Sequence, residues 1–597
     1  MRSTFFGLNT LLRALQTQQL ALDTTNHNIA NANTEGYSRQ VASMVATRPY
    51  TMPGRSRPAS MPLAIGTGVQ ADQIRRQRDA FVDLEVRQQL QAQRQWETLA
   101  AGLRQVEGIF AEPSDHSLQA LISNFFNAWS ELSNDPESSA VRAAVRASGE
   151  SLATGFNDLG RRLEQMRQDV DGAISLKVPE INLIGAELAS LNDQIMKAVG
   201  AGDVPNDLRD RRDLLLDELV KLTGATYREE LDGSTSVFLG ARTFVAGNMV
   251  SELATETRAL ASGGQIHLLQ WARDGAAVRI DGGELKGQLE LRDQTLPEQL
   301  RQLNLLASTL AGAVNDQHRQ GFGTGAFSST VSNFFDPVAT TATLNSTGLG
   351  NDLYGGQITV NGVAVTVDPG SQTLSAVMTS ITSAIGGGAT WTLDGATGTI
   401  SITYTSATAV TLGGPADTSN FLQLVGLLGA PDTIVAGGPP PVHRITGVAP
   451  VALVRAATMA VDQAIKNDVQ AIAAAAGSSV GLTTAAGPGD NRNALAIAGL
   501  QRTALAALGS ATFEEYYAST VAALGVQVRQ ADELSSNQAL VTQHLELRRQ
   551  SISGVSLDEE ATRLIQYQHA YEAAARAITA LDEMLETIIN RMGRVGM

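Results

Sequence analysis

The chain has 597 residues, several times the usual domain length of roughly 100 to 200 residues, so we expect more than one domain. Its 44 Lys and Arg residues are outnumbered by 60 Asp and Glu residues. The resulting formal net charge of −16 argues against nucleic acid or an anionic membrane as the main partner. The absence of cysteine excludes disulfides, thiolate nucleophiles and cysteine metal sites. No signal-peptide pattern and no apolar run of about 18 residues is found, so we expect a soluble chain whose secretion would need no cleavage.

The first helix is predicted from Leu8, where apolar or amide residues begin to recur in alternating steps of four and three. This is the pattern of a coiled-coil seam. Its members are Leu8, Leu12, Leu15, Gln19, Leu22, Asn26 and Ile29. A polar residue on such a seam weakens packing but fixes register and partner, so we expect Gln19 and Asn26 to be buried in that role.

The stretch NHNIANAN, residues 26–33, follows directly and holds four asparagines in eight positions. Asparagine is a poor helix former because its amide competes for backbone hydrogen bonds. The stretch therefore either ends the helix or has a specialised role.

The middle of the chain changes from helices to strands and back. Helices are expected from about 84 to 200, with a break at Asn134–Pro136, and again at 206–222. Strands are expected at 234–247, after a turn at Asp232–Gly233, and throughout a β-rich segment at about 330–445. That segment contains an Asn361–Gly362 hairpin and ends at a stiff GGPPP linker, after which helices are expected at 450–477 and from 490 onward.

The C-terminal helix repeats the seam of the first helix for four heptads. Its members are Leu564, Tyr567, Tyr571, Ala574, Ile578, Leu581, Leu585, Ile588 and Met592. Ser556 and Glu559 form a capping-box pattern that marks its start. An isolated helix of this length is marginal in water, so it needs a partner. The first candidate is the N-terminal helix of the same chain, and the second is the helix pair of a neighbouring copy.

These patterns predict a mainly α fold with an inserted β region. The N- and C-terminal helices pair in a coiled-coil-like stem, followed by a mixed α/β middle and a β-rich outer domain. The expected divisions are 1–110 for the N-terminal stem and connector, 111–330 for the mixed domain, 331–445 for the β-rich domain and 446–597 for the C-terminal helical region. The subunit should be rod-like, with the terminal helices at one end and the β-rich domain at the other.

Catalytic and metal-binding patterns are weak. Gly66, Gly68 and Ala71 fit a dinucleotide-binding spacing, but no βαβ unit surrounds them, and the seven histidines show no metal-ligand spacing. The alternating Asp and Arg residues of 206–222 are predicted to form ion pairs within their helix. We therefore expect no catalytic, cofactor or metal site.

Several blocks resemble a known family. ALDTTNHNIANANTEGYSRQ, residues 21–40, closely resembles the N-terminal motif of bacterial flagellar rod, hook and hook-associated proteins. Further blocks are similar, in order and spacing, to the hook-associated protein 1 family of the first hook–filament junction. They lie at 66–89, 206–222, 282–293, 303–323, 487–501 and 553–593. Ser556 replaces the asparagine of that family, a conservative exchange at a helix cap. Residues 330–445 resemble only the variable β-rich outer domains of flagellar axial proteins.

The resemblance implies a structural adaptor that assembles as a ring between hook and filament and is needed for filament attachment. It implies export through the flagellar type III apparatus without cleavage, and a location outside the cell at the hook–filament junction. The implied partners are further copies of the chain, the hook protein, the second junction protein (hook-associated protein 3) and an export chaperone at the C-terminal helix. No cofactor, nucleic acid or membrane insertion is implied.

The resemblance also suggests an assembly interface at the two ends of the chain. Asn31, Asn33, Thr34 and Gly36 would end the first helix, and Tyr37 and Arg39 would start the connector. Asn26 and Asn28 would bond to neighbouring chains, although for Asn28 by itself a solvated helix end is favoured. The full interface is predicted to contain Leu8, Leu12, Leu15, Leu22, Asn26, Asn28, Ile29, Asn31, Asn33, Gly36, Tyr37, Leu564, Tyr567, Tyr571, Ile578, Leu581, Leu585 and Ile588.

Two alternatives remain open at this point. The first is a hook or distal rod subunit, against which the long C-terminal block and the 206–222 block argue. A less favoured alternative is a peptidoglycan hydrolase carried on an axial-protein scaffold.

Overall fold

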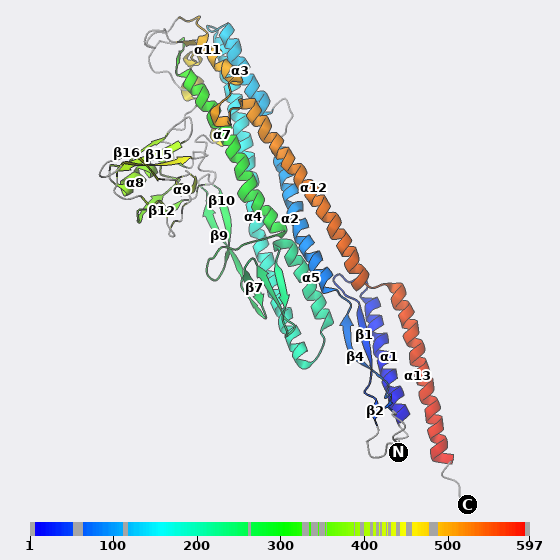
Figure 1. Ribbon diagram of the computed structural model, residues 1–597. Coiled ribbons are helices and arrows are strands. Elements are labelled where there is room, and N and C mark those ends of the chain that lie inside the picture. Colours follow the sequence, from blue (N-terminus) through cyan, green and yellow to red (C-terminus); the bar gives the residue numbers. More distant parts are fainter. Residues whose placement is uncertain are drawn as a thin grey trace, which may run out of the picture.

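The molecule is an elongated rod in which both ends of the chain lie at one end (Figure 1). This computed structural model describes 6–51, 64–110, 117–260, 264–324, 334–335, 344, 353, 355–386, 388–393, 399–405, 410–413, 417, 419, 421–424, 427, 432–436, 442–448, 456–476 and 487–591. At the end that holds the termini, the first helix and the last lie side by side. They are α1 (Phe6–Ala30) and α13 (Leu557–Arg591).

The stem is completed by a β-ribbon that packs on α1. Its long strands are antiparallel, with a bulge between Ser43 and Met44, and a shorter pair extends it. The strands are β1 (Gln40–Ala46), β2 (Tyr50–Thr51), β3 (Ala64–Ile65) and β4 (Val69–Arg76). We call α1, β1, β4 and α13 the terminal stem.

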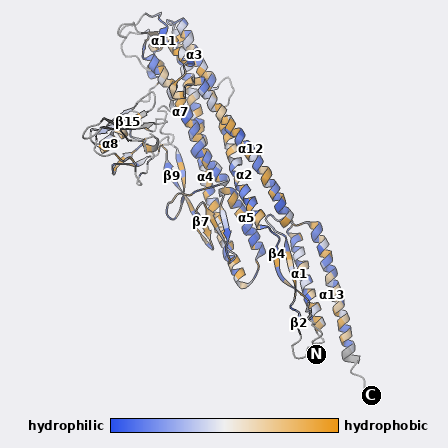
Figure 2. Ribbon diagram, viewed as in Figure 1, coloured by the Kyte–Doolittle hydropathy of each residue, from blue (hydrophilic) through white to orange (hydrophobic). Residues whose placement is uncertain are grey.

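Long helices run along the body of the rod, and short ones cover the end opposite the termini (Figure 1). The long helices are α2 (Ala80–Phe110), α4 (Ser139–Ala201), α7 (Leu296–His318) and α12 (Phe513–Ser553), and the far end holds α3 (Leu118–Asn134) and α11 (Arg492–Gly499). Each helix alternates apolar and polar residues along its length (Figure 2), as expected of helices that bury one face. No helix among the described residues is apolar over a length that would cross a membrane.

The predicted break at Asn134–Pro136 is confirmed, because α3 ends at Asn134 and α4 begins at Ser139. Ser117 and Ser138 each cap a helix, since their hydroxyls accept the backbone N–H groups of Ala120 and Val141. A cluster of aromatic side chains fixes this end of the body, with ring centroids 5.0 Å apart for Phe334 and Phe335.

The mixed region packs α5 and two small sheets against the lower part of α4. The elements are α5 (Asn206–Thr223), the four strands β5 (Thr226–Glu229), β6 (Thr235–Leu239), β7 (Arg242–Ala246) and β8 (Met249–Val250), and the hairpin of β9 (Leu253–Ala259) and β10 (Gln265–Trp271). The chain returns to the body through α6 (Gly283–Glu290) and a π-helical turn, η2 (Leu291–Thr295). The predicted turn at Asp232–Gly233 joins β5 to β6, where Gly233 adopts a φ of 83°.

The β-rich region has its own core, and its predicted hairpin is confirmed. Asn361 and Gly362 have φ values of 49° and 77° between paired strands, as a type I′ turn requires. The described elements are β12 (Gly356–Val360), β13 (Val363–Val367), α8 (Leu374–Ile385), β14 (Thr390–Leu393), β15 (Thr399–Thr405), α9 (Phe421–Leu424), β16 (Asp432–Ala436) and β17 (Val442–Val448). The region projects from the side of the rod, so its predicted place at the end opposite the termini is wrong (Figure 1). The GGPPP linker lies outside the described residues.

The prediction of helices at 450–477 is confirmed only in small part, because within the described residues of that segment the one α-helix is α10 (Gln463–Asn467). Two single 3₁₀ turns, η5 (Ala456–Thr458) and η6 (Val469–Ala471), flank α10. A strand, β18 (Ala475–Ala476), follows and pairs with β11 (Gly321–Phe322). Tertiary hydrogen bonds hold the extended backbone, because Ala473 N–H donates to His318 Nε2 and the carbonyl of Ile472 accepts from Arg142. After α11 the long helix α12 starts at a capping box formed by Thr512 and Glu515. The domain divisions themselves stay a prediction.

Candidate assembly site in the terminal stem

The predicted seam of α13 is the side of that helix with the least solvent exposure. Ala574 is buried, and Leu564, Tyr567, Tyr571, Ile578, Leu581 and Leu585 are half-buried, whereas most residues between them are exposed. A Cβ placed on Gly7 of α1 would lie 3.3 Å from Leu581 Cδ1, so the two helices approach closely there. The side chain of Ile588 and all of Met592 lie outside the described residues. The stem therefore contains a seam that one chain fills only in part, and its coiled-coil geometry stays a prediction.

The seam of α1 divides into two sets, each with a spacing of seven residues. Leu8, Leu15, Leu22 and Ile29 are half-buried. Leu12, Gln19 and Asn26 are exposed, with 46% of Leu12 accessible to solvent. The expectation that Gln19 and Asn26 are buried is therefore wrong within one chain, because the ribbon and α13 cover other sides of α1.

Asn28 is the asparagine of this stretch that the fold buries, with 1% of its surface exposed. Its Nδ2 donates to the carbonyl of Gln40 at 2.8 Å and to Glu560 Oε2 at 2.9 Å. Its Oδ1 accepts from Tyr37 Oη at 2.7 Å and from Gln40 N at 2.9 Å. Both donors and both lone pairs of the amide are used within the chain. The interpretations of Asn28 as a solvated residue or as one that bonds to a neighbouring chain are therefore wrong.

The remaining residues of the stretch form the turn after α1. Asn31 Nδ2 donates to the carbonyl of His27 at 3.0 Å and so caps the helix end, and Asn33 is exposed. Gly36 takes a φ of 77°, where a Cβ would lie 3.2 Å from Leu214 Cβ. Gly36 thus supplies the expected left-handed turn, whereas Asn31 and Asn33 do not adopt positive φ values.

Tyr37 lies against His27, with ring centroids 5.5 Å apart. Burial raises the pKa of the Tyr37 phenol far above its ordinary value, and the charges of Asp207, Asp210 and Glu560 raise it further. The phenol therefore keeps its proton and remains a donor to Asn28.

Arg39 holds the first turn of α13 through the carboxylates of two adjacent residues. Its Nη1 lies 2.9 Å from Glu559 Oε2, and its Nε donates to Glu560 Oε1 at 2.8 Å. Its backbone N–H also donates to the carbonyl of Ser553, the last residue of α12. The Glu560 side chain is 1% exposed, so its charge is balanced by Arg39 and by the amide of Asn28. This arrangement fixes the connector against the turn between α12 and α13.

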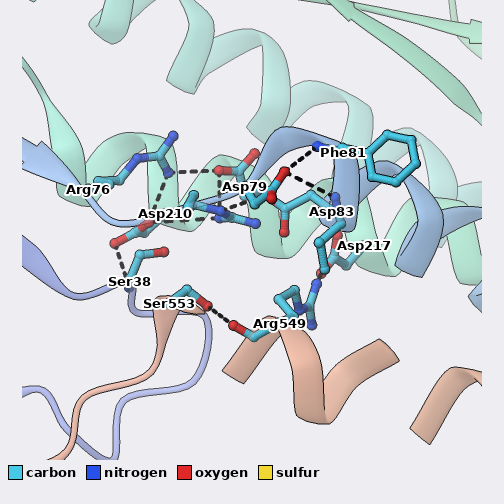
Figure 3. Close-up of polar contacts among 12 residues, drawn as sticks. Ser38, Arg76, Asp79, Phe81, Asp83, Asp210, Asp217, Arg549 and Ser553 are labelled. Atoms are coloured by element: carbon cyan, nitrogen blue, oxygen red, sulfur yellow. Dashed lines mark hydrogen bonds and ion pairs between the residues drawn. The ribbon is translucent and has the colours of Figure 1, made fainter. Parts of the chain in front are cut away.

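A second group of charges ties the connector to the body, and Figure 3 shows part of it. Arg76 Nη1 lies 2.8 Å from Asp210 Oδ1 and 2.7 Å from Asp213 Oδ2. Ser38 N–H donates to the other oxygen of Asp210 at 3.0 Å. Arg78 bridges Asp213 to Asp83 near the start of α2.

The same network reaches the end of α12. Arg87 of α2 and Arg549 of α12 share Asp217 of α5, at 2.5 Å and 2.7 Å. The Arg87 guanidinium also stacks 4.5 Å over the ring of Tyr227. We call the set Ser38, Arg76, Arg78, Asp83, Arg87, Asp210, Asp213, Asp217 and Arg549 the ionic elbow. It joins the stem ribbon, α2, α5 and α12 at one place.

The pKa values of two carboxylates of the ionic elbow are shifted in opposite directions. Burial by itself would raise the pKa of Asp213, but the charges of Arg78, Arg76 and Arg87 outweigh burial and hold the pKa well below its ordinary value. For Asp210 burial prevails, so its pKa is raised although Arg76 and Ser38 act against the change.

The expectation of ion pairs within the helix at 206–222 is wrong. Asp210 and Asp213 pair with arginines of the connector and α2, and Arg212 and Arg211 pair with Glu229 and Glu187. The i, i+3 and i, i+4 spacing of the sequence offers local partners, but the buried face of α5 places its acids against other elements.

The glycines at 66 and 68 belong to the ribbon of the stem. Gly68 adopts a φ of 105° directly before β4, and a Cβ there would lie 3.1 Å from Thr10 of α1. Its neighbouring strands are antiparallel, so this glycine serves close packing of the ribbon on α1.

The chain is similar to known proteins over nearly its whole length. The flagellar hook-associated protein 1 of Bacillus subtilis (strain 168) is 30% identical over 629 residues, covering 99% of each chain. The chain belongs to the flagellar hook-associated protein 1 family. The proteins of that name in Salmonella typhimurium (strain LT2) and Escherichia coli (strain K12) are 28% and 27% identical, each covering 98% of this chain and 99% of the relative.

Family models and a solved structure agree with this membership. Residues 103–335 match the flagellar hook-associated protein FlgK helical domain, residues 8–37 the flagella basal body rod protein, and residues 549–592 the flagellar basal body rod FlgEFG protein C-terminal model. The flagellar hook junction protein FlgK of Burkholderia pseudomallei has the same fold, with a TM-score of 0.54 and 18% identity over 79% of this chain and 100% of its own. As a member of the family, the chain is a structural protein of the flagellar hook–filament junction, and a hook or rod subunit or a hydrolase is not favoured.

Proposed function

We propose that the chain is a non-catalytic adaptor that assembles as a ring of like subunits and is needed for filament attachment. The hook protein would bind on one side and the second junction protein, hook-associated protein 3, on the other. The observation that carries the proposal is the partly filled seam of the terminal stem. It has a half-buried row on α13 and an exposed row, Leu12, Gln19 and Asn26, on α1.

A partly filled seam favours association. Each large apolar side chain that moves from half-buried to buried contributes about 1 kcal/mol, and the seam offers several in one stripe. The exposed amides Gln19 and Asn26 would find partners on a neighbouring chain and would select one register, as polar residues do on helical seams. Gln19 and Asn26 would then become buried, as expected from the sequence, only in the assembled ring.

The elbow gives the adaptor its mechanical role. Buried ion pairs are directional and costly to break singly, so they hold the stem at one angle to the body. If the ionic elbow is rigid, the position of the stem in the ring sets the position of the body, which faces the next component. Such a unit suits the junction between a curved hook and a straight filament.

The same seam supports the proposal that a chaperone binds the chain before export. Before export, when α13 is not yet packed on α1, the apolar stripe from Leu564 to Leu585 would be exposed and would favour aggregation, so a chaperone would cover it. We propose that the chain leaves the cell through the flagellar export apparatus without cleavage and acts outside the cell.

Electron microscopy of cells that lack this gene, with an assay of flagellin in the culture medium, tests the proposal. The expected result is hooks without filaments and flagellin lost to the medium. Intact filaments would contradict it. Digestion of cell-wall sacculi by the purified chain would contradict the non-catalytic part of the proposal, which predicts none.

A further inference from the structure

The terminal stem has two outer sides that differ in charge. α1 contacts both the β1–β4 ribbon and α13, and Figure 1 shows the ribbon and α13 on opposite sides of α1. One outer side of the stem is therefore the ribbon and the other is the outward face of α13. Each is long enough to pack along a neighbouring stem.

The ribbon side presents unpaired cations beside exposed apolar residues. Arg48 and Arg75 are exposed, and within the described residues neither has an ion-pair partner. Val45 is 37% exposed on the same ribbon, and Tyr50, 47% exposed, also packs its ring edge-on against Phe6 of α1 at a centroid distance of 6.5 Å. Asp72 is an exposed acid of β4 and reduces the positive charge without cancelling it.

The α13 side presents acids beside exposed apolar residues. Asp558, Ile565, Glu572 and Glu583 follow one another at steps of seven, seven and eleven residues, which place them on one face turned away from the seam. Ile565 is 54% exposed. Glu572 pairs with Arg576, whereas Asp558 and Glu583 have no ion-pair partner among the described residues.

We infer that the outward face of α13 in one copy docks on the β1–β4 ribbon of the next copy. The two faces are different surfaces of one chain, so the contact is heterologous, and repetition of a heterologous contact produces a ring or a helical array. Copies of a chain with a net charge of −16 repel one another overall, so local complementarity must select the contact. Exposed ion pairs add little affinity singly, and their effect here is to set the register of the apolar residues.

This docking contact rests on the proposed self-assembly and adds to that proposal the two faces that meet. It also assigns a role to the outer face of the ribbon, the face that is turned away from α1.

The absence of cysteine allows a direct test by cross-linking. Val45→Cys is expressed in one gene copy, and Ile565→Cys, Glu572→Cys or Glu583→Cys in the other. Flagella are then isolated from cells that produce both chains and are oxidised. We expect a disulfide-linked heterodimer for at least one of the three pairs, and no homodimer for any single variant. Leu176→Cys, on an exposed position of α4, is the control and should give no heterodimer with Val45→Cys.

Heterodimers absent from all three pairs, or homodimers of Val45→Cys, would overturn the inference. A charge test separates docking from chance proximity. Adding Arg75→Glu to the Val45→Cys chain should reduce the heterodimer, whereas Arg75→Lys should retain it, and equal yields would overturn the role of charge. If filaments need the chain but no heterodimer forms, this inference alone fails. If cells without the gene keep their filaments, the proposed function fails.

Discussion

Asn28 in the first helix and Glu560 in the last are joined by a hydrogen bond of 2.9 Å, although 532 positions separate them in the chain. Glu560 is also held by Arg39 of the connector. One buried carboxylate therefore fixes three segments: the end of α1, the start of the ribbon and the first turn of α13.

Replacing Asn28 by alanine should destabilise the stem. The change leaves Glu560 Oε2 and the backbone of Gln40 without the partners that Asn28 supplies, and a lost buried hydrogen bond to a charged group costs about 2 to 3 kcal/mol. Hydrogen exchange of α1 and of the start of α13, followed by mass spectrometry, measures the local free energy of opening. Asn26→Ala, two residues away and exposed, should change it by less than about 0.5 kcal/mol. Equal protection in the two variants would contradict the role assigned to Asn28.

Arg39 and Glu560 should show strong coupling in a double-mutant cycle. Arg39→Met leaves a buried carboxylate without its counter-ion, which costs about 3 to 5 kcal/mol in comparable sites. Combining it with Glu560→Gln removes the unpaired charge, so the double variant should be more stable than the sum of the single losses. Hydrogen exchange at the α12–α13 turn provides the readout. Additive losses would show that the pair does not act as a unit.

The ionic elbow should respond to pH in two stages. The pKa of Asp210 is raised by burial, so acidification from neutral pH toward the ordinary value of 3.8 protonates Asp210 in the folded state first and stabilises that state. The pKa of Asp213 is lowered, so its stabilising contribution is present above 3.8 and is lost as the pH falls below 3.8.

Urea midpoints of far-UV circular dichroism, recorded from pH 7 to pH 3, test this order. Asp210→Asn should remove the gain above pH 3.8, and Asp213→Asn should lower stability at pH 7 by about 3 kcal/mol, because Arg76, Arg78 and Arg87 then face one another with less negative charge. A wild-type chain that loses stability steadily from pH 7 downward would contradict the assignment for Asp210.

Gly36 should not tolerate a side chain. Its φ of 77° disfavours any L-residue, and an added Cβ would press on Leu214, so Gly36→Ala should cost about 1 to 2 kcal/mol. Gly200→Ala is the matched control and should have the opposite effect on stability. Gly200 lies in helix α4 with open space around it, so the alanine should raise the free energy of unfolding by up to about 1 kcal/mol. Thermal unfolding followed by circular dichroism compares the two. A neutral Gly36→Ala would mean that the connector has another conformation.

The sequence predicted the helices of the stem and the seam of α13, because that seam is continuous over four heptads. It also predicted the Asn361–Gly362 hairpin, since a type I′ turn needs residues that accept positive φ. It did not predict that continuous helix is absent from the described residues 456–476, because two distant residues hold the backbone near Ile472: Ala473 N–H donates to His318, and Arg142 donates to the carbonyl of Ile472.

The ionic elbow was also missed. The Asp and Arg residues of α5 have good local spacing for ion pairs, and only the tertiary fold shows that they face the connector and α2. Asn28 could not be separated from its neighbouring asparagines by pattern, since its burial depends on Glu560 near the other end of the chain. The only sequence signal was the density of asparagines itself, which indicated a special segment without indicating which residue matters.

In the proposed function, the seam of the terminal stem drives assembly. Cells that lack the gene are complemented with Ile578→Glu, on the half-buried side of α13, or with Thr579→Glu, its exposed neighbour. Immunoblots of the medium confirm export, and electron microscopy records the fraction of hooks that carry filaments. We predict that Ile578→Glu is exported but leaves hooks bare, because the seam would have to bury a charge, whereas Thr579→Glu restores filaments. Filaments and normal swimming in the Ile578→Glu cells would contradict this role of the seam.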